Sequence, residues 1–356
     1  MTTAYDTWAA AGPTRKYEQW VGHDRLLYLT FGGRITQVVY TLAKLNVADT
    51  LREGPRSAAE IAEITGSDPD ALLQVLRASA AVGLFEETPD EKFRLTTVSH
   101  TLRTDVEDSL RDLILFQGDE LLWQPLGHLD HTVRTGRPSF EHVYGRPFYE
   151  HLTADSHAAG RFEKAMVQRS ELMKDLYSDL DFTPFHTIAD LGGGRGHFLA
   201  RVLQRTPAAK GILFDRAAVA AEAVALLAEY GVADRTEVVS GSFFTGVPEG
   251  ADAYILEAVL HEWRDDDAVA ILRQVRAAIG DRPGARVFIL DKLLNGRLNA
   301  FDYGKLLCLD MLVHTGGRDR ALADWLRLID AGGFELDGEP PSPERSPWVA
   351  FVCRPK

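Results

Sequence analysis

Apolar residues recur at the spacing of one helix face near the start of the chain. The positions on this face are Ile35, Val38, Val39, Leu42 and Leu45. An apolar residue every three or four positions predicts an amphipathic helix that buries one side. The first half of the sequence reads as almost entirely helical, and this includes the stretch from about residue 110 to 180.

Two more helices and a hairpin are expected after this stripe. Ser57 stands three residues before Glu60, which is the spacing of a capping box at the start of a helix. Asp68 and Pro69 mark the start of a second helix, because Asp caps a helix and Pro fits its first turn. Residues 84–95 follow as two short β-prone segments around a polar turn. Two helices and a hairpin form the outline of a winged helix-turn-helix.

The pattern changes after Pro184 to strands and helices in alternation. The expected strands cover residues 187–191, 211–214, 236–240, 253–257 and 285–290, and the expected helices cover 197–205, 217–230 and 265–279. Such alternation predicts a parallel sheet with helices on both faces. Ligands of these α/β folds bind at the carboxyl ends of the strands, so the search for chemistry begins there.

Composition and charge narrow the classes of protein. The chain has 356 residues, of which 45% are hydrophobic and 26% charged, as expected of a globular protein with about two domains. Its two cysteines are too few for a disulfide framework or a zinc ribbon. No apolar run reaches the length of a membrane span and the first twenty residues lack a signal-peptide pattern, so we expect a cytoplasmic location.

The winged-helix outline raises the question of DNA binding. The whole chain has 39 Lys and Arg against 52 Asp and Glu, a net charge of −13. Residues 51–95 alone contain five basic residues against nine acidic ones. Because this sign of charge repels phosphates, we expect a packing or dimerisation scaffold rather than a transcription regulator, which would show salt-sensitive DNA binding.

A glycine cluster follows the first predicted strand, in the order Asp190-Leu191-Gly192-Gly193-Gly194-Arg195-Gly196-His197. The dinucleotide fingerprint G-x-G-x-x-G would need glycine where His197 stands, so the pattern here is G-x-G-x-G. The second strand ends in Asp215, which is placed to bind ribose hydroxyls. Together these features favour S-adenosylmethionine over a nicotinamide cofactor. A nicotinamide-dependent dehydrogenase is kept as an alternative that a binding measurement would test.

These motifs resemble a known family. Residues 187–356 are similar to the catalytic domain of the class I, caffeic-acid O-methyltransferase-like enzymes of plants and bacteria, which include tailoring enzymes of antibiotic biosynthesis. The matching stretches are 189–196, 214–215, 241–244, 260–263 and 311–318. The resemblance implies a Rossmann-like α/β domain over residues 184–356, a winged-helix dimerisation domain over 1–110, and a helical linker over 111–183 that contributes to the acceptor pocket.

The resemblance also implies the catalytic residues. His261 takes the place of the family's general base, and a histidine suits proton abstraction because imidazole ordinarily titrates near neutrality. Asp291 and Asp319 take the places of two carboxylates that orient the base. Plant members typically have Glu at both positions, so the shorter side chains here imply a closer backbone or a bridging water.

The cofactor residues that the resemblance implies are Gly192, Gly193 and Gly194 for the methionine end, Asp215 for the ribose, and Ser242 and Phe243 for the adenine. Two positions depart from the family pattern. Ser242 stands where Asp is common, and Glu257 stands where relatives often carry Lys or Arg. Glu257 would either complement the positive cofactor or face solvent.

The expected acceptor residues are Phe162, Met166, Arg169, Met311 and His314, and the resemblance implies that Phe162 and Met166 clamp an aromatic ring. The first three lie at i, i+4 and i+7, on one helix face. If Arg169 points inward, it would pair with a carboxylate of the acceptor, as in a phenolic acid or an aromatic amino acid. The alternative is a solvated arginine on the helix surface.

No metal site is predicted, because His128 and His131 share a helix face without an evident third ligand. The sequence therefore predicts a homodimeric, metal-independent methyltransferase that uses S-adenosylmethionine and acts on a phenolic or hydroxylated aromatic small molecule in bacterial secondary metabolism. Methylation of a ring carbon stays open, since the same base would deprotonate the phenol. A relative that has abandoned methyl transfer is a further alternative, which the presence of His261 disfavours.

Overall fold

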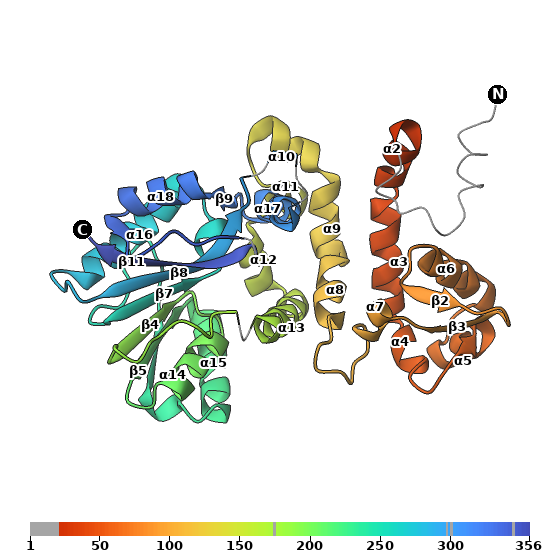
Figure 1. Ribbon diagram of the computed structural model, residues 1–356, viewed down its shortest axis with the longest axis horizontal. Coiled ribbons are helices and arrows are strands. Elements are labelled where there is room, and N and C mark those ends of the chain that lie inside the picture. The colour runs from red at the N-terminus through yellow and green to blue at the C-terminus, as the bar shows by residue number, and fades with distance from the viewer. Residues whose placement is uncertain (1–20, 174–175, 297, 300–301, 344–345) are drawn as a thin grey trace. The chain divides into compact units, whose positions relative to one another are not determined.

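The computed structural model describes residues 21–173, 176–296, 298–299, 302–343 and 346–356 (Figure 1). The described residues fall into two compact units, and each is considered by itself. The first unit runs up to Trp123 and also includes Gly160–Arg169. The second unit comprises Gln124–Ala159 and Ser170–Lys356.

The first unit is mainly helical and contains one small antiparallel sheet of order β1-β3-β2. Its strands are β1 (Arg56–Ser57), β2 (Phe85–Glu87) and β3 (Lys92–Leu95). Its helices are α2 (Gly22–Thr30), α3 (Gly32–Lys44), α4 (Val47–Thr50), α5 (Ala58–Thr65), α6 (Pro69–Ala81), α7 (Thr97–His100) and α8 (Arg111–Gln117). Two helices have residues in both units, α9 (Glu120–Gly127) and α13 (Ser156–Leu172).

The winged-helix outline is confirmed in this unit. Ser57 and Glu60 form the expected capping box, in which the Ser57 N–H donates to Glu60 Oε2 at 2.7 Å and the Glu60 N–H donates to Ser57 Oγ at 3.3 Å. Asp68 caps α6 by accepting from the Ala71 N–H. The core of the unit is built from fully buried side chains that include Leu42, Ile61, Leu76, Phe85 and Phe93.

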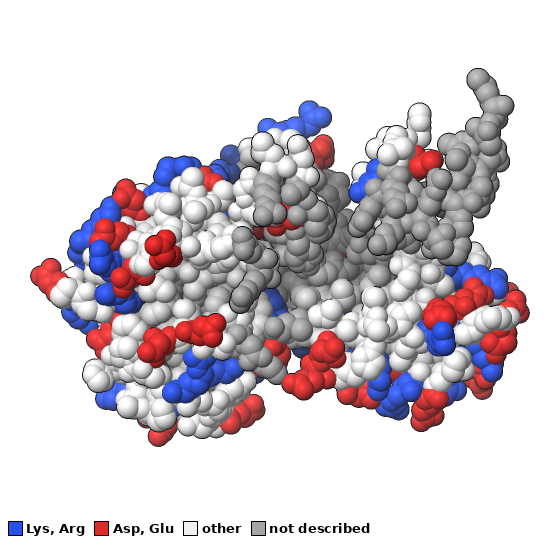
Figure 2. Space-filling model, viewed as in Figure 1, with Lys and Arg blue, Asp and Glu red and all other residues white. Residues whose placement is uncertain are grey.

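The basic residues of the winged-helix segment are all engaged by nearby carboxylates. Their ion pairs are Arg52–Asp105, Arg56–Glu53, Arg77–Glu87, Lys92–Asp90 and Arg94–Glu86. On the face of the molecule in Figure 2, Lys and Arg lie among Asp and Glu rather than gathering in a stripe. This distribution agrees with the expectation that the segment does not grip phosphates.

The second unit is built on one large sheet with the order β10-β11-β8-β7-β4-β5-β6, and β9 pairs with β8 beside this path. Its strands are β4 (Thr187–Leu191), β5 (Lys210–Asp215), β6 (Thr236–Ser240), β7 (Ala253–Glu257), β8 (Arg286–Leu294), β9 (Arg320–Ala321), β10 (Phe334–Leu336) and β11 (Trp348–Pro355). Its other elements are α10 (Leu129–Thr135), α11 (Ser139–Tyr144), α12 (Phe148–Ala154), α14 (His197–Arg205), α15 (Ala217–Glu229), η2 (Ala233–Arg235), η3 (Leu260–Glu262), α16 (Asp265–Ile279), α17 (Tyr303–His314) and α18 (Leu322–Ala331).

Helices cover both faces of this sheet, as predicted. One buried cluster joins the sheet to α14 and α15, and a second joins the other face to α16 and α18. Five neighbouring strands, β8-β7-β4-β5-β6, run parallel. Because β4 pairs with β5 on one side and with β7 on the other, the strand order reverses at β4. This switch point is where α/β folds bind ligands, at the carboxyl end of the sheet.

The sheet differs from the prediction in two respects. The prediction ended a strand at residue 290, whereas β8 continues to Leu294, so Asp291 lies inside the strand and not just after it. The added length is paired on both sides: β11 pairs antiparallel with β8 from Trp348↔Lys292 to Cys353↔Val287, and β9 pairs with Leu293 and Leu294. The sheet is therefore mixed, since β10 and β11 add two antiparallel strands to the parallel set. No helix among the described residues is long and apolar enough to cross a membrane.

Replacing Ile61 by Ala is expected to lower the free energy of unfolding of the first unit by about 2–5 kcal/mol, because its fully buried side chain would leave a cavity. Ile64 is the matched control: it lies on the same helix but is 55% exposed, so Ile64→Ala should change that free energy by less than about 0.5 kcal/mol. Urea titration of both variants measures the difference. Equal losses would contradict this assignment of the core.

Candidate active site

The glycine loop after β4 presents bare backbone at the switch point. Gly192 and Gly194 have φ of 74° and 59°, which only glycine adopts readily. A Cβ on Gly192 would meet Val259 at 2.9 Å and Phe243 at 3.0 Å, and a Cβ on Gly193 would meet the Asp190 carboxylate at 2.5 Å. A side chain therefore has no room at Gly192 or Gly193. The N–H groups of Gly192 and Gly194 are bonded within the fold, to the Phe214 carbonyl and the Asp215 carboxylate.

Two carboxyl groups lie against this loop. Asp215, at the end of β5, accepts hydrogen bonds from the Gly194 N–H at 2.9 Å and the Arg216 N–H at 2.7 Å. Asp190, in β4, is fully buried and its carboxylate oxygens have no hydrogen-bond partner among the described residues. Burial, together with the charges of Glu257 and Asp215, raises the pKa of Asp190 well above its ordinary value. Burial also raises the pKa of Asp215. The loop is thus surrounded by acidic groups that a cationic ligand would complement.

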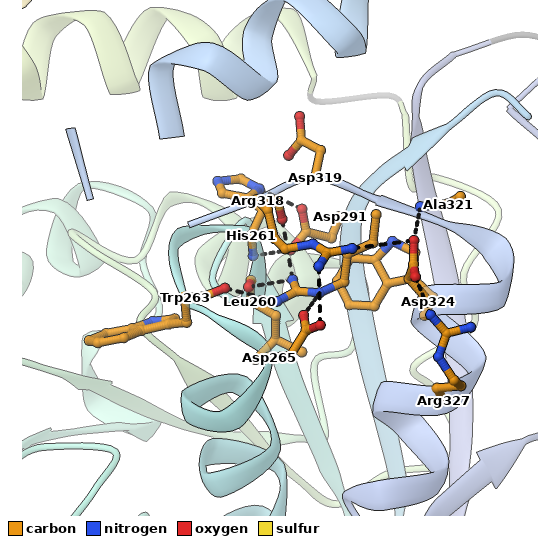
Figure 3. A network of polar contacts seen from close by, with 12 residues as sticks. Leu260, His261, Trp263, Asp265, Asp291, Arg318, Asp319, Ala321, Asp324 and Arg327 are labelled. Atoms are coloured by element: carbon orange, nitrogen blue, oxygen red, sulfur yellow. Dashed lines mark hydrogen bonds and ion pairs between the residues drawn. The ribbon is translucent and has the colours of Figure 1, made fainter. Parts of the chain in front are cut away.

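His261 and Asp291 form a buried pair at the same edge of the sheet (Figure 3). His261 lies in η3 directly after β7, and its Nδ1 is 2.5 Å from Asp291 Oδ1. The His261 N–H also donates to Asp291 Oδ2 at 3.1 Å. Burial alone would raise the pKa of Asp291, but the adjacent His261 outweighs it and the pKa lies below its ordinary value. Asp291 therefore stays ionised and fixes both the ring and the backbone of His261.

The second expected carboxylate has a different direct partner. Asp319 Oδ2 lies 2.8 Å from the ammonium Nζ of Lys292, and both side chains are buried. Among the described residues, no hydrogen bond joins Asp319 to His261, and the ion pair of Asp319 is with Lys292, which follows Asp291 along β8. Burial raises the pKa of Asp319, while the charge of Lys292 opposes this. Asp319 and His261 therefore interact through their charges and not through a hydrogen bond. Sequence reasoning missed Lys292, since the ion pair depends on a contact between distant segments.

A tyrosine also reaches this region from α12. The Tyr149 hydroxyl donates a hydrogen bond to Glu262, the residue after His261. The Arg216 guanidinium lies over the Tyr149 ring, 4.5 Å from its centroid. Burial and then the Glu262 charge raise the pKa of Tyr149 well above its ordinary value, so the phenol keeps its proton. Glu262 follows β7 and Arg216 follows β5, and these strands lie on either side of β4. Tyr149 therefore contacts the residues that follow both strands beside the glycine loop. The sequence carried no local signal for this contact.

The other expected cofactor residues lie at the end of β6. The Phe243 ring packs edge-on against Phe214, with centroids 5.8 Å apart, and lies beside Gly192. Ser242 is exposed and its Oγ accepts from the Phe244 N–H at 3.3 Å. The structure thus brings Phe243 to the glycine loop, and it leaves the Ser242 hydroxyl accessible.

The expected acceptor residues are divided between the units. Phe162, Met166 and Arg169 lie in the part of α13 that belongs to the first unit, where the Phe162 ring packs against Phe116. Met311 and His314 lie in α17 of the second unit, where Met311 is half-buried.

His314 has less freedom to contact an acceptor than expected. It is buried, with ring centroids 6.1 Å from Phe140 and 5.9 Å from Phe148.

The histidines considered as metal ligands form a small cluster in the second unit. His142 joins His128 and His131, and the rings of His131 and His142 stack with centroids 4.1 Å apart. Stacked rings direct their nitrogens side by side and not toward one point. Within the described ranges, no group of three or more His, Cys, Asp or Glu side chains is arranged to hold a metal ion.

Two family models match this chain. Residues 126–335 match the O-methyltransferase domain, and residues 27–105 match the O-methyltransferase dimerisation domain. The first match covers the glycine loop, Asp215, His261, Asp291 and Asp319. The second covers the winged-helix segment, which therefore matches the dimerisation domain of this family.

Relatives of known activity support the same assignment. The chain is 39% identical to the 8-amino-8-demethylriboflavin N,N-dimethyltransferase of Streptomyces davaonensis, over 93% of this chain and 95% of that one. It is 36% identical to the O-demethylpuromycin-O-methyltransferase of Streptomyces alboniger, over 97% and 92% of the two chains. Among solved structures, it matches an O-methyltransferase from neocarzinostatin biosynthesis, in complex with S-adenosylmethionine and 2-hydroxy-5-methyl naphthoic acid, with a TM-score of 0.81, 30% identity and coverage of 95% and 100%. The chain therefore belongs to the S-adenosylmethionine-dependent O-methyltransferase family.

Proposed function

We propose that this enzyme transfers a methyl group from S-adenosylmethionine to the hydroxyl of a phenolic small molecule in bacterial natural-product biosynthesis, with His261 as the general base. The observation that supports this most strongly is the buried His261–Asp291 pair at the carboxyl edge of the strands that flank the glycine loop. The dehydrogenase alternative has no comparable support, because the fingerprint glycine is missing at His197.

The residues at the switch point fit the cofactor. When bound, S-adenosylmethionine supplies a methyl group activated by a positively charged sulfur. The bare loop from Gly192 to Gly194 would lie against its methionine end, and Asp215 would accept hydrogen bonds from its ribose hydroxyls. Glu257 acts on the buried Asp190 beside the loop, and its negative charge would complement the sulfonium. Phe243 and Ser242 would contact the adenine.

The His261–Asp291 pair defines the direction of proton transfer. Asp291 would accept a hydrogen bond from the Nδ1–H of His261, and this tautomer leaves the ring's lone pair on Nε2. His261 Nε2 would take the proton of the acceptor hydroxyl when that oxygen receives the methyl group. Asp291 stabilises the imidazolium that forms. Asp319 adds a second negative charge nearby, moderated by Lys292.

Nitrogen is a second candidate acceptor atom, and the relative from Streptomyces davaonensis favours it. An aromatic amine attacks before it loses its proton, so it depends less on a base than a phenol does. Ring-carbon methylation, expected as an alternative, would use the same base. Homodimerisation through the domain at residues 27–105 and the cytoplasmic location also stay proposals.

The proposal is tested by mass spectrometry after incubation with methyl-deuterated S-adenosylmethionine and a panel of phenols, phenolic acids, aromatic amines and polycyclic phenols. His261→Ala should slow labelling of a phenol by about 10²–10⁴-fold, the usual contribution of a general base. His186→Ala is the matched control, since this exposed histidine lies at the opposite edge of the sheet, just before β4. Fragmentation locates the label on oxygen, nitrogen or carbon. Full activity of the His261 variant on a phenol would contradict the assigned base.

Removal of divalent metals is expected to leave the rate unchanged, because the histidine–aspartate pair supplies the base and the sulfonium supplies the activated methyl group. The measurement is the labelling rate before and after dialysis against a chelator. A loss of activity that magnesium restores would show that the enzyme depends on a metal.

Arg169→Gln tests the class of acceptor. If Arg169 pairs with an acceptor carboxylate, this change should raise the KM for a phenolic acid by about tenfold or more, as the loss of a charge-assisted pair predicts. The KM for a neutral phenol and the Kd for S-adenosylmethionine should not move. An unchanged KM for the phenolic acid would remove Arg169 from the site.

A further inference from the structure

The turn that carries His261 is only weakly stabilised by its own backbone. Ala258, just before η3, has φ of 54°, in the left-handed region that disfavours residues with a side chain. The turn is three residues long, and its two internal backbone hydrogen bonds measure 3.2 and 3.4 Å, at the long end of the usual range. The position of His261 must therefore be fixed by groups outside the turn.

Arg320 supplies such contacts from β9, which pairs with β8 at Leu293. Its Nη1 donates to the carbonyl oxygen of Leu260 at 2.8 Å, and its Nη2 donates to the carbonyl oxygen of Trp263 at 2.8 Å. These two carbonyls flank His261 on either side in the sequence. One guanidinium therefore spans the turn, with the Leu260 carbonyl on Nη1 and the Trp263 carbonyl on Nη2.

The guanidinium is itself held in place. Arg320 is 0% exposed, its Nε donates to Asp265 Oδ1 at 2.9 Å, and it lies over the Trp325 ring at 5.3 Å from the centroid. Asp265 begins α16, so the same arginine ties the turn to the next helix. A planar group with donors on three nitrogens fits this set of acceptors, and a lysine ammonium does not.

The chain also approaches the turn closely just before Arg320. A Cβ on Gly317 would lie 2.1 Å from the carbonyl oxygen of His261 and 2.7 Å from Glu262 Cα. Glycine at 317 lets this segment lie directly on the turn, and Arg320 then holds the turn at both ends. Asp291 binds the ring and the N–H of His261, whereas Arg320 binds the carbonyls on either side of it. Asp291 and Arg320 therefore act on different parts of the turn.

We propose that Arg320 is a positioning residue that holds His261 at the acceptor by clamping the carbonyls of Leu260 and Trp263. This proposal rests on the proposed role of His261 as the base. Loss of the clamp leaves the fold and the cofactor loop in place but moves the imidazole. A displacement of about 1 Å costs on the order of 10²-fold in rate.

Arg320→Lys is the test variant, because it keeps the buried positive charge beside Asp265 but cannot span both carbonyls. Its kcat for a phenol should fall by about 10²-fold, whereas its Kd for S-adenosylmethionine, measured by calorimetry, should stay within about twofold. Arg318→Gln is the matched control, since Arg318 also pairs with Asp265, at 3.3 Å, but touches neither carbonyl and is 47% exposed. This control should retain its kcat.

Two further measurements separate positioning from a loss of folding and from a failure of the proposed function. Guanidinium ion should fill the site vacated in Arg320→Ala and raise the kcat of that variant about tenfold or more. It should leave the kcat of Arg318→Gln unchanged. The NMR signal of the His261 ring, assigned by its loss in His261→Ala, should shift in Arg320→Lys and not in the control, whether or not His261 is the base. A folded Arg320→Lys enzyme with an unchanged kcat and an unmoved His261 signal would overturn the proposal.

Discussion

The hydrogen bond between His261 Nδ1 and Asp291 Oδ1 joins the turn after β7 to the middle of β8, and both residues are buried. A buried carboxylate is costly unless it is fully hydrogen-bonded. Asp291 meets this demand with the ring and the N–H of His261 and with the Lys292 N–H. The same three bonds leave the imidazole one orientation. The same hydrogen bonds therefore stabilise the buried Asp291 charge and orient the His261 ring. The surrounding contacts keep the His261–Asp291 hydrogen bond intact.

Charged groups next to this bond are themselves paired. Lys292 neutralises Asp319, and Arg320 is paired with Asp265 while it binds the backbone of the turn. The Lys292–Asp319 pair is buried on both sides, and such a pair adds little net stability compared with apolar side chains. Its value here is geometric, because the pairing of β8 with β9 brings Lys292 and Asp319 together. The geometry of the active site therefore depends on strand pairing as well as on residue type.

Sequence patterns were sufficient where the signal is local. The strands 187–191, 236–240 and 253–257 were predicted with the bounds that β4, β6 and β7 have, since apolar runs and turn residues lie within a few positions of each other. The approach of Asp215 to the glycine loop also followed, because adjacent parallel strands end at the same edge. The apolar run at residues 348–353, which forms most of β11, was a readable signal that the prediction overlooked, and with it the extension of β8 past residue 290.

Contacts between distant segments could not be predicted in this way. Tyr149 and Glu262 are 113 residues apart, and Arg320 and Leu260 are 60 apart, so no spacing rule relates them. Asp319 shows the same limit: the resemblance gave its position but not its partner, because Lys292 approaches it only when β9 pairs with β8. The family resemblance indicated roles for individual residues, and the structure showed the hydrogen bonds and ion pairs between them.

A double-mutant cycle on kcat/KM for a phenol, with His261→Ala, Asp291→Asn and the double variant, tests the central claim most directly. If Asp291 acts by holding His261 as the base, its loss matters little once the imidazole is gone, so the double variant should be within about threefold of His261→Ala. Losses that multiply in the double variant would show that the two side chains act independently, and would contradict the account.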